Sequence, residues 1–508
     1  MSRDAIATTA IRGVESFYAD LHADPGALRV CQGTSCWLAG GDAVWAAHAR
    51  SASCRPAYCL GFCDRSPALL RPDGAVVTGA NARSGRRADP AEVRPDVRCL
   101  APEPIVTARI GRGSFAAIDA ARGDGAYTAL ARALAGPREA VVAAVERSGQ
   151  RGRGGGAFPT AAKWRACAAA PAASRVVIAN GDEGDPGSFV DRVLMEDDPH
   201  AVIEGLLLCA YAVGASQGIV FIRSEYPRAQ QRMALAIEQA RAAGLAGSRI
   251  LGSDFDCELS VVSGRGSYVC GEETALIEAI EGRRGEVRLR PPYPSERGLY
   301  GLPTVVQNVE TLAGVPAIVA RGGAWYAELG TRGCAGTIAL CLNAGFARPG
   351  IVEVEFGTPL ATVLEHAGGA AGGGALDAVL LGGPMGSVVL PRDFDALVCY
   401  DAGGSRGLRL GHGGLVALPL GADLRGLLLH WLAFMRDESC GRCAPCRLGS
   451  ARAHRHLADE PGAAPRAALL RLFDVMEQAS LCAFGQLVPG PMRELATHFG
   501  DRVFGDAT

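Results

Sequence analysis

The chain has 508 residues, a formal net charge of −2 and 17 cysteines. This length allows about three or four domains, and without a basic block or an acidic tail the sequence indicates neither nucleic-acid binding nor a solvating arm. Because acid occurs early at the N-terminus and no apolar stretch follows, no secretory signal is expected. The cysteines then favour metal ligation and buried thiols over disulfides, and we expect a cytoplasmic protein.

The apolar pattern predicts four regions in chain order. Residues 1–100 carry their own cysteine group and end in a proline-rich linker at 90–104. From about 105 to 345, strands alternate with helices, which indicates an α/β domain. Residues 346–420 predict a small α+β module, and the segment beyond Asp423 predicts a bundle of four helices.

The elements expected in these regions are short and well bounded. The expected strands are Arg175–Ala179, Gly218–Ile222, Leu259–Val262, Gly350–Val354 and Ala378–Leu381. The expected helices are Arg228–Ala243, Leu360–Ala367, Leu424–Asp437, Arg447–Leu457, Ala463–Ala479 and Pro491–Phe499. The most apolar stretch, Ala201–Ile222, contains Glu204 and Gln217, so it predicts a buried helix and strand and not a membrane span.

Four cysteines near the C-terminus have the spacing of iron–sulfur ligands. Cys440, Cys443 and Cys446 form a C-x-x-C-x-x-C motif, and 35 residues separate it from Cys482. This pattern is typical of a [4Fe–4S] cluster. Such a cluster takes one electron at a time, so the sequence predicts an electron-transfer protein.

A glycine run lies early in the α/β region. Four of the five residues 152–156 are glycine, with Arg153 among them and Lys163 shortly after. Glycine lets backbone N–H groups approach a phosphate or a flat ring, and a helical segment follows, so an anion-binding turn is favoured over a flexible surface loop. No clear strand precedes the run, which distinguishes it from the usual dinucleotide-binding fingerprint.

Two further loops follow predicted strands. Residues 180–189 are acidic, and residues 264–276 combine glycines with Glu272 and Glu273 at the start of a helix. Open α/β sheets bind ligands at the carboxyl ends of their strands, so both loops predict a binding site. A solvated turn and simple stabilisation of a helix N-terminus are the alternatives.

Together with residues 290–294 and 301–311, these segments resemble the NADH-binding, FMN-containing subunit of respiratory complex I. Soluble relatives of that subunit occur in NAD-dependent formate dehydrogenases and NAD-reducing hydrogenases. The resemblance runs from about residue 105 to the C-terminus and also covers 357–360, 382–384, 438–447 and 480–482. It implies a multidomain α/β protein with a Rossmann-like FMN- and NAD-binding domain at 105–345, a ubiquitin-like SLBB module at 346–420 and a helical bundle with a [4Fe–4S] cluster at 421–508.

The resemblance also implies the cofactor-binding residues. FMN is assigned to Gly152, Arg153, Gly154, Gly155, Lys163, Asn180, Asp182, Glu183, Tyr268, Gly271, Glu272, Asn308 and Thr311. NAD is assigned to Phe158, Asp185, Glu273, Arg290 and Tyr293. Asp185, Arg290, Tyr293 and Gln307 depart from the residues common in the family. Since hydride transfer needs no side-chain acid or base, Glu183, Glu272 and Glu273 are expected to tune the flavin potential and to weaken binding of the reduced nucleotide.

A second cysteine group lies in the N-terminal region. Cys31 and Cys36 form one pair, Cys59 and Cys63 a second, and 22 residues separate the pairs. Their loops resemble the thioredoxin-like [2Fe–2S] ferredoxins, which implies a thioredoxin-like domain at 1–100 that holds a [2Fe–2S] cluster. A zinc site, or a structural domain with vestigial thiols, would fit the same residue types.

The remaining cysteines and one histidine carry no clear signal. Nine cysteines lack ligand spacing and are predicted to be buried apolar residues: Cys54, Cys99, Cys167, Cys209, Cys257, Cys270, Cys334, Cys341 and Cys399. His412 is predicted to be a turn residue of the small module and not a catalytic group.

The resemblance implies a diaphorase subunit. It exchanges hydride between NAD(H) and FMN and passes single electrons through the [4Fe–4S] cluster to or from partner subunits. The N-terminal domain and the lack of added C-terminal ferredoxin modules favour the β subunit of an NAD-dependent formate dehydrogenase. The expected partners are a small thioredoxin-like [2Fe–2S] subunit and a large molybdenum or tungsten subunit, with no nucleic acid and no direct membrane insertion. The alternatives are the diaphorase subunit of an NAD-reducing hydrogenase, a complex I subunit, or a non-catalytic electron-transfer scaffold.

Overall fold

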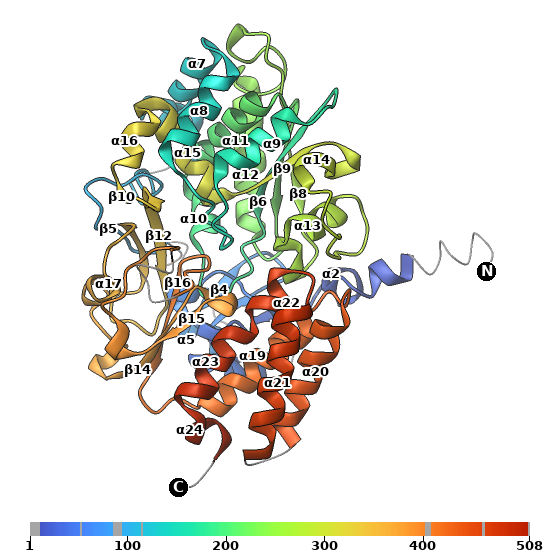
Figure 1. Cartoon of the computed structure of the whole chain (residues 1–508), viewed down its shortest axis with the longest axis vertical. Coiled ribbons are helices and arrows are strands. Elements are labelled where there is room, and N and C mark those ends of the chain that lie inside the picture. The colour runs from blue at the N-terminus through green and yellow to red at the C-terminus, as the bar shows by residue number, and fades with distance from the viewer. Residues whose placement is uncertain are drawn as a thin grey trace, which may run out of the picture.

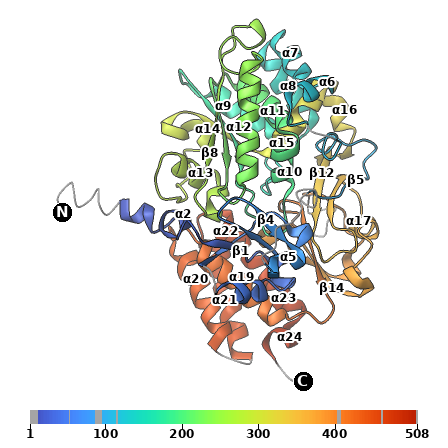
Figure 2. The ribbon, with the colours of Figure 1, turned by 180° about the vertical axis from the view of Figure 1, so that it is seen from behind.

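The structure is a computed structural model that describes residues 11–50, 53–84, 94–112, 115–401, 408–459 and 463–505. Figure 1 shows the α/β domain at the top, the small module at the lower left and the C-terminal bundle at the lower right. Figure 2, from behind, shows the N-terminal domain in front of the bundle. Each predicted region thus has its own place, and all four meet near the centre of the molecule.

A parallel sheet in the order β8-β7-β6-β9 forms the centre of the α/β domain. Its strands are β6 (Val176–Gly181), β7 (Gln217–Ile222), β8 (Glu258–Ser263) and β9 (Thr304–Asn308). Because side chains alternate along a strand, Val177 and Ala179 of β6 face one apolar cluster and Val176 and Ile178 face another. Successive apolar residues therefore bury both faces of the sheet, as parallel sheets require.

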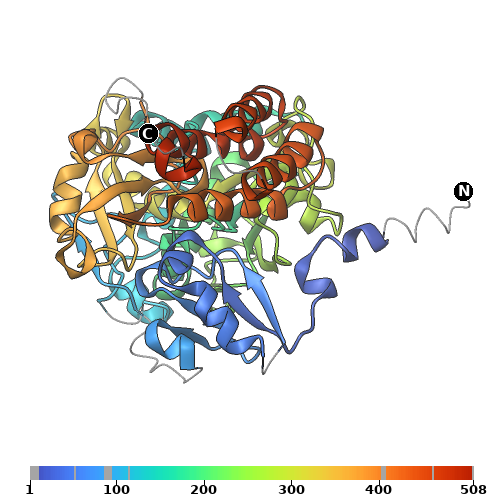
Figure 3. The ribbon, with the colours of Figure 1, turned by 90° about the horizontal axis from the view of Figure 1, so that it is seen from below.

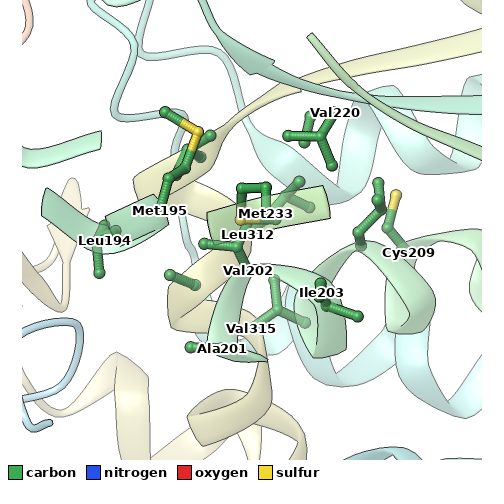
Figure 4. Packing of buried hydrophobic residues seen from close by; sticks show 14 of the residues in the cluster. Leu194, Met195, Ala201, Val202, Ile203, Cys209, Val220, Met233, Leu312 and Val315 are labelled. Carbon is green, nitrogen blue, oxygen red and sulfur yellow. The ribbon is translucent and has the colours of Figure 1, made fainter. Parts of the chain in front are cut away.

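Helices of this domain pack on both faces of the parallel sheet. They are α6 (Ile118–Gly123), α7 (Thr128–Leu134), α8 (Arg138–Ser148), α9 (Thr160–Ala169), α10 (Val190–Asp197), α11 (Pro199–Val213), α12 (Pro227–Ala242), α13 (Glu273–Ile280), α14 (Pro294–Arg297), α15 (Val309–Arg321) and α16 (Gly323–Ala327). Figure 4 shows the main core, where α10, α11, α12 and α15 bury apolar side chains against β7. Helices α11 and α15 approach most closely at Gly205, where a Cβ would lie 2.0 Å from the Leu312 carbonyl oxygen.

The small module is a six-stranded sheet in the order β15-β14-β16-β12-β13-β5. Its strands are β5 (Val97–Cys99), β12 (Thr337–Leu342), β13 (Gly350–Glu355), β14 (Leu376–Leu381), β15 (Ser387–Val389) and β16 (Gly414–Pro419), with helix α17 (Leu360–His366). The predicted boundary at 345/346 is wrong because β12 pairs with β13. The linker prediction at 90–104 is also incomplete because β5 pairs in parallel with β13.

Glu353 of β13 anchors the chain that follows β5. One carboxylate oxygen accepts the N–H groups of Ile105 and Val106 at 2.9 and 3.2 Å, and the other accepts the N–H of Thr107 at 3.0 Å. The Thr107 and Thr337 hydroxyls, both 2.6 Å away, complete the set. A fully buried carboxylate with this many donors is well satisfied, so the entry into the α/β domain is fixed to the small module.

The N-terminal domain has a four-stranded sheet in the order β2-β1-β3-β4. Strands β1 (Leu28–Cys31) and β2 (Cys54–Ala57) are parallel, while β3 (Ala68–Leu70) and β4 (Val76–Thr78) form an antiparallel pair beside β1. Its helices include α2 (Ala19–His22), α3 (Thr34–Leu38), α4 (Gly41–His48) and α5 (Gly79–Ser84). This part of the chain is therefore a mixed α/β unit, and its assignment as a thioredoxin-like domain stays a prediction.

The C-terminal bundle contains the expected long helices with small shifts at their ends. They are α19 (Leu424–Glu438), α20 (Ala444–Asp459), α21 (Ala463–Ala479) and α23 (Pro489–His498), joined by the short α22 (Ala483–Leu487) and α24 (Gly500–Phe504). Figure 3 shows the bundle lying against the N-terminal domain, where Trp37 stacks on His430 and the Trp431 indole donates to the Thr34 hydroxyl at 3.1 Å. Among the described residues, no helix is both long and apolar enough to cross a bilayer.

The close approach of α11 and α15 makes Gly205→Ala a test of the core. The added methyl meets a helix backbone that cannot move alone, so we expect a loss of about 1–3 kcal/mol or more in stability and a lower Tm of thermal unfolding. Gly123→Ala is the matched control, because no atom lies within 4 Å of a Cβ at that helical position. Equal Tm values for the two variants would contradict the packing described here.

Candidate functional site

Residues 151–159 form a tight loop whose ends are paired by a β-bridge, and the Gly152 N–H donates across it at 2.9 Å. A Cβ on Gly154 would lie 3.0 Å from the Asn308 Cβ. Gly155 has a φ of +93°, which disfavours side chains. The loop therefore rests directly on the N-terminus of α15, and glycine is required at both positions.

Arg153 directs its side chain into the protein interior. Its guanidinium donates to the Tyr326 hydroxyl at 2.9 Å and the Thr337 carbonyl at 3.0 Å, and it lies 4.6 Å over the Phe356 ring. Its backbone N–H donates to Thr311 Oγ1 at 2.9 Å. The charge that the sequence suggested for a phosphate is thus engaged elsewhere, and Arg153 fixes the loop to the small module.

The acidic loop after β6 packs on the turn before α13. Asn180 donates from Nδ2 to the Gly271 carbonyl at 2.9 Å and accepts the Asp182 N–H at 3.1 Å. A Cβ on Gly271 would lie 3.3 Å from the Asp182 carboxylate. Burial raises the pKa of Asp182 well above its usual range, although Arg223 opposes this shift. The predicted flavin residues on these two loops are therefore in direct contact.

Glu183 continues this acidic loop and caps α10. Its carboxylate oxygens accept the N–H groups of Asp191 and Arg192, each at 2.9 Å. Burial and the charge of Asp191 raise the pKa of Glu183 to about 7, while His412 opposes the shift. Glu183 is therefore held in a position set by the backbone, with a pKa near neutrality.

Asp185 and Tyr268 connect the pocket to the bundle. The Tyr268 hydroxyl donates to Asp185, and the Tyr268 N–H donates to Glu438 at 2.9 Å. The Tyr268 ring packs against Phe434 and Phe484, with centroids 5.1 and 5.4 Å away. One residue thus contacts the predicted NAD residue and two aromatic rings of the cysteine-bearing bundle.

The start of α13 places two glutamates side by side with different partners. Glu272 is the N-cap and accepts the N–H of Thr274 at 2.9 Å. Glu273 is paired with Lys163 at 2.9 Å and with Arg290 at 3.2 Å. Although burial opposes it, these two cations hold the pKa of Glu273 below its usual range. Glu273, a predicted NAD residue, therefore joins the predicted FMN residue Lys163 to a second predicted NAD residue, Arg290.

The remaining predicted residues complete the two sides of the site. Asn308 caps α15 by accepting the Thr311 N–H at 3.0 Å. Phe158 and Tyr293 are exposed, at 56% and 53%. Exposed aromatic rings are suited to cover a flat ligand ring. The two predicted NAD aromatics therefore lie at the surface, whereas the predicted flavin residues range from buried, as Asp182 is, to exposed, as Gly154 is.

The four cysteines of the bundle lie close to these loops. Cys440, Cys446 and Cys482 are buried, and they belong to the same apolar cluster as Tyr268. The Cys440 carbonyl accepts a hydrogen bond from Arg284, which follows α13, at 2.8 Å. The [4Fe–4S] motif and the acidic loops are therefore parts of one packed region.

The comparisons with known proteins agree with this geometry. Residues 145–317 match the model of the Nuo51 FMN-binding domain, and residues 426–504 match the NADH-ubiquinone oxidoreductase-F iron–sulfur binding region. The NADP-reducing hydrogenase subunit HndC of Solidesulfovibrio fructosivorans is 40% identical over 72% of this chain and 76% of its own length.

The chain belongs to the family of FMN- and iron–sulfur-binding NADH oxidoreductase subunits.

Two further relatives extend this result. One of the NADH-quinone oxidoreductase subunits of Rhizobium meliloti is 42% identical over 64% of this chain and 78% of its own length. A solved structure of an NAD⁺-reducing [NiFe]-hydrogenase in the H₂-reduced state matches with a TM-score of 0.84 and 29% identity, covering 99% of this chain and 89% of that chain. The predicted family, the FMN domain and the [4Fe–4S] region are confirmed.

The described residues also fit an FMN group by the chemistry of their donors. Two buried oxygens, Glu272 Oε1 and Gln307 Oε1, lack a hydrogen-bond partner among the described residues. A Cβ on Gly152 would lie 3.7 Å from the Gln307 amide, which places that side chain beside the glycine loop. Buried polar atoms without partners are uncommon in native proteins, and these two oxygens are acceptors that a ligand beside the glycine loop and α13 would be able to satisfy.

The N-terminal cysteines also come together. Cys31, Cys36, Cys59 and Cys63 are all buried. The Cys59 and Cys63 sulfurs are 3.4 Å apart, and the Cys31 thiol interacts with those of both Cys36 and Cys59. A Cβ on Gly33 would lie 3.5 Å from Pro186 in the acidic loop. This thiol group therefore lies beside the predicted nucleotide site.

Sequence reasoning missed two residues of the site. His412 does lie in a turn, as predicted, but its imidazole is buried 3.2 Å from Asp191. Asp191 carried no sequence signal, because an acid in the first turn of a helix is common. The identity of their partners depends on the docking of the small module onto the α/β domain, which no local pattern records.

Two of the cysteines predicted to be buried apolar residues are buried and lie next to each other. The Cys334 and Cys399 sulfurs are 3.1 Å apart, and the Arg151 guanidinium is 3.8 Å from Cys334. With Asp401 they form a group of possible metal ligands. They are separated by 65 residues in sequence, so spacing alone could not reveal the pair.

The glycine loop supports a direct test of the FMN site. In Gly154→Ala the new methyl meets the Asn308 side chain, which α15 holds in place, so we expect FMN affinity to fall about tenfold or more. Gly156→Ala is the matched control, because a Cβ there has no atom within 4 Å. Fluorescence titration of the flavin-free protein measures both, and equal FMN dissociation constants would contradict this role of Gly154.

Proposed function

We propose that this chain exchanges hydride between NAD(H) and FMN and passes the electrons one at a time to the [4Fe–4S] cluster held by Cys440, Cys443, Cys446 and Cys482. Bound FMN would accept two electrons together from the nucleotide and release them one at a time. The observation that carries the proposal is Tyr268, which contacts both the acidic loop and the aromatic residues of the bundle. A flavin site and a cluster site joined through one residue suit electron transfer between them.

In this proposal the residues of the chain position FMN and NAD(H) and tune the reduction potential of the flavin. None of them transfers a proton in the hydride step. The glycines admit the flavin to the backbone, and Lys163 and Asn180 orient polar groups at its edge. Glu183, Glu272 and Glu273 place negative charge beside the bound groups, which opposes tight binding of electron-rich reduced forms. This acidic environment would favour the release of electrons toward the cluster.

For the N-terminal domain we propose a [2Fe–2S] cluster held by Cys31, Cys36, Cys59 and Cys63. The support is the burial of all four thiols and their mutual contacts. The position of the Cys31–Cys36 loop beside Pro186 would put this cluster near the nucleotide site and give electrons a second exit. A zinc site and vestigial thiols remain the alternatives that iron analysis separates.

The partner subunit that exchanges electrons with this chain determines which substrate the whole complex uses. We propose an NAD-dependent formate dehydrogenase with a molybdenum or tungsten subunit and a small thioredoxin-like [2Fe–2S] subunit. A hydrogenase is the second candidate, since the solved NAD⁺-reducing [NiFe]-hydrogenase matches 99% of the chain. Metal analysis of the co-purifying large subunit distinguishes them, since molybdenum or tungsten supports the first and nickel the second.

The diaphorase role is tested with NADH and ferricyanide. The FMN-loaded chain should reduce ferricyanide with NADH, whereas a non-catalytic scaffold binds FMN and shows no activity.

Arg290→Ala should raise the KM for NADH several-fold and leave kcat less affected, because it removes one partner of Glu273 at the exposed side of the site. Arg147→Ala, the loss of an exposed arginine on α8, is the control, and an unchanged KM in Arg290→Ala would remove Arg290 from the NAD site.

The N-terminal cluster is tested by iron content. Cys59→Ser should lower bound iron by about two ions per chain and remove the spectroscopic signal of one cluster, because one ligand is lost. Cys54→Ser, in the same domain but outside the thiol group, should retain full iron. Wild-type protein with iron for the [4Fe–4S] cluster alone would show that these thiols hold no [2Fe–2S] cluster.

A further inference from the structure

His412 is the point at which the small module enters the flavin site. Its imidazole Nε2 lies 3.2 Å from the Asp191 carboxylate and 3.1 Å from the Asn308 amide nitrogen, and Nδ1 lies 3.9 Å from Glu183. Its backbone is also close, since a Cβ on Gly155 would lie 3.7 Å from the His412 nitrogen. One side chain thus contacts the acidic loop, the N-terminus of α10 and the cap of α15.

The groups that face His412 are mostly acidic and come from three elements. Glu183 and Asp185 belong to the loop after β6, Asp191 to α10, and Glu310 to α15. All four are buried. Burial opposes charge on the imidazole, but Asp191 and Glu183 outweigh it and raise the pKa of His412 to about 10. His412 therefore carries a positive charge at neutral pH and balances part of this acidic group.

The same group is poorly suited to a metal ion. Both oxygens of Glu183 already accept backbone N–H groups of α10, and Asp191 accepts the Asn308 amide and the Glu310 N–H. A protonated imidazole has no lone pair for a metal. The arrangement therefore fits an internal cation paired with carboxylates.

We propose that His412 is a positioning residue for the flavin reaction, a buried cation supplied by the small module that holds the carboxylates of Asp191 and Glu183 in place and sets the reduction potential of bound FMN. This inference rests on the proposed flavin site around Glu183 and Asn308. A positive charge near the flavin favours its electron-rich reduced form, whereas the surrounding carboxylates disfavour it. The balance between them would decide how readily the flavin gives electrons to the cluster.

His412→Gln tests this role, with His200→Gln as the matched control. His200, on α11 of the α/β domain, is also buried, but burial lowers its pKa to about 4, so the control removes a neutral imidazole. In His412→Gln we expect the FMN midpoint to become more negative, so that the ratio of reduced to oxidised flavin at a fixed potential falls about tenfold. The control should keep the wild-type midpoint.

The pH profile separates a charge effect from a structural one. Because His412 keeps its proton up to about pH 10, the midpoint difference from wild type should persist between pH 6 and 9 and shrink above that range. The stabilising contribution of the raised pKa is complete below about pH 6.5 and is lost as pH rises through about 10. A purely structural residue would lower Tm without moving the midpoint, and that result would overturn the proposal.

Asp191→Asn provides the opposite change and keeps the test decisive if His412→Gln folds poorly. It removes one negative charge, and the single oxygen of the amide keeps one of the two hydrogen bonds that Asp191 accepts, so the midpoint should become more positive. The double variant should lie between the two single variants. Dithionite titration measures every midpoint without NADH. Failure of NADH to reduce the flavin would therefore contradict the proposed function alone. Unmoved midpoints in both single variants would contradict the proposed role of His412.

Discussion

The burial of carboxylates at the edge of the central sheet is the constraint on which the rest of the structure depends. Five acidic side chains are less than 10% exposed there: Asp182, Glu183, Asp185, Asp191 and Glu310. A buried carboxylate is costly unless it is hydrogen-bonded or paired. Their partners come from other parts of the chain, namely the N-terminus of α10, Arg223 after β7, Tyr268 before α13 and His412 of the small module. The packing of the regions therefore also determines which charged and polar groups lie beside these carboxylates.

Contacts with this edge hold the bundle and the N-terminal domain beside it. Tyr268 joins it to the bundle, and Arg223 donates to the Tyr58 carbonyl beside the N-terminal thiols at 2.6 Å. Arg192, at the start of α10, donates to the Gly61 carbonyl at 3.0 Å. Each module that bears cysteines is thus hydrogen-bonded to the acidic loop or to its partners.

The sequence predicted what is local and failed where the chain folds back on itself. Strand β6 and the bundle helices were visible in apolar periodicity, and the cysteine motif of the iron–sulfur binding region was visible in its spacing. The side-chain direction of Arg153 could not be read, because it depends on Tyr326 and Phe356 far along the chain. The same holds for His412 and for the pair of Cys334 and Cys399. The boundary of the small module was misplaced because β12 is as apolar as a strand of the parallel sheet.

The pairing of β5 with β13 limits how this protein could be divided. Strand β5 precedes the α/β domain, yet it covers the edge of a sheet formed more than 200 residues later. Cutting the chain after the N-terminal domain would expose the N–H and C=O groups of β13, and open edges of this kind promote association between chains. The N-terminal domain therefore cannot be removed without affecting the small module, because the segment that follows it includes β5, which is a strand of the sheet of that module.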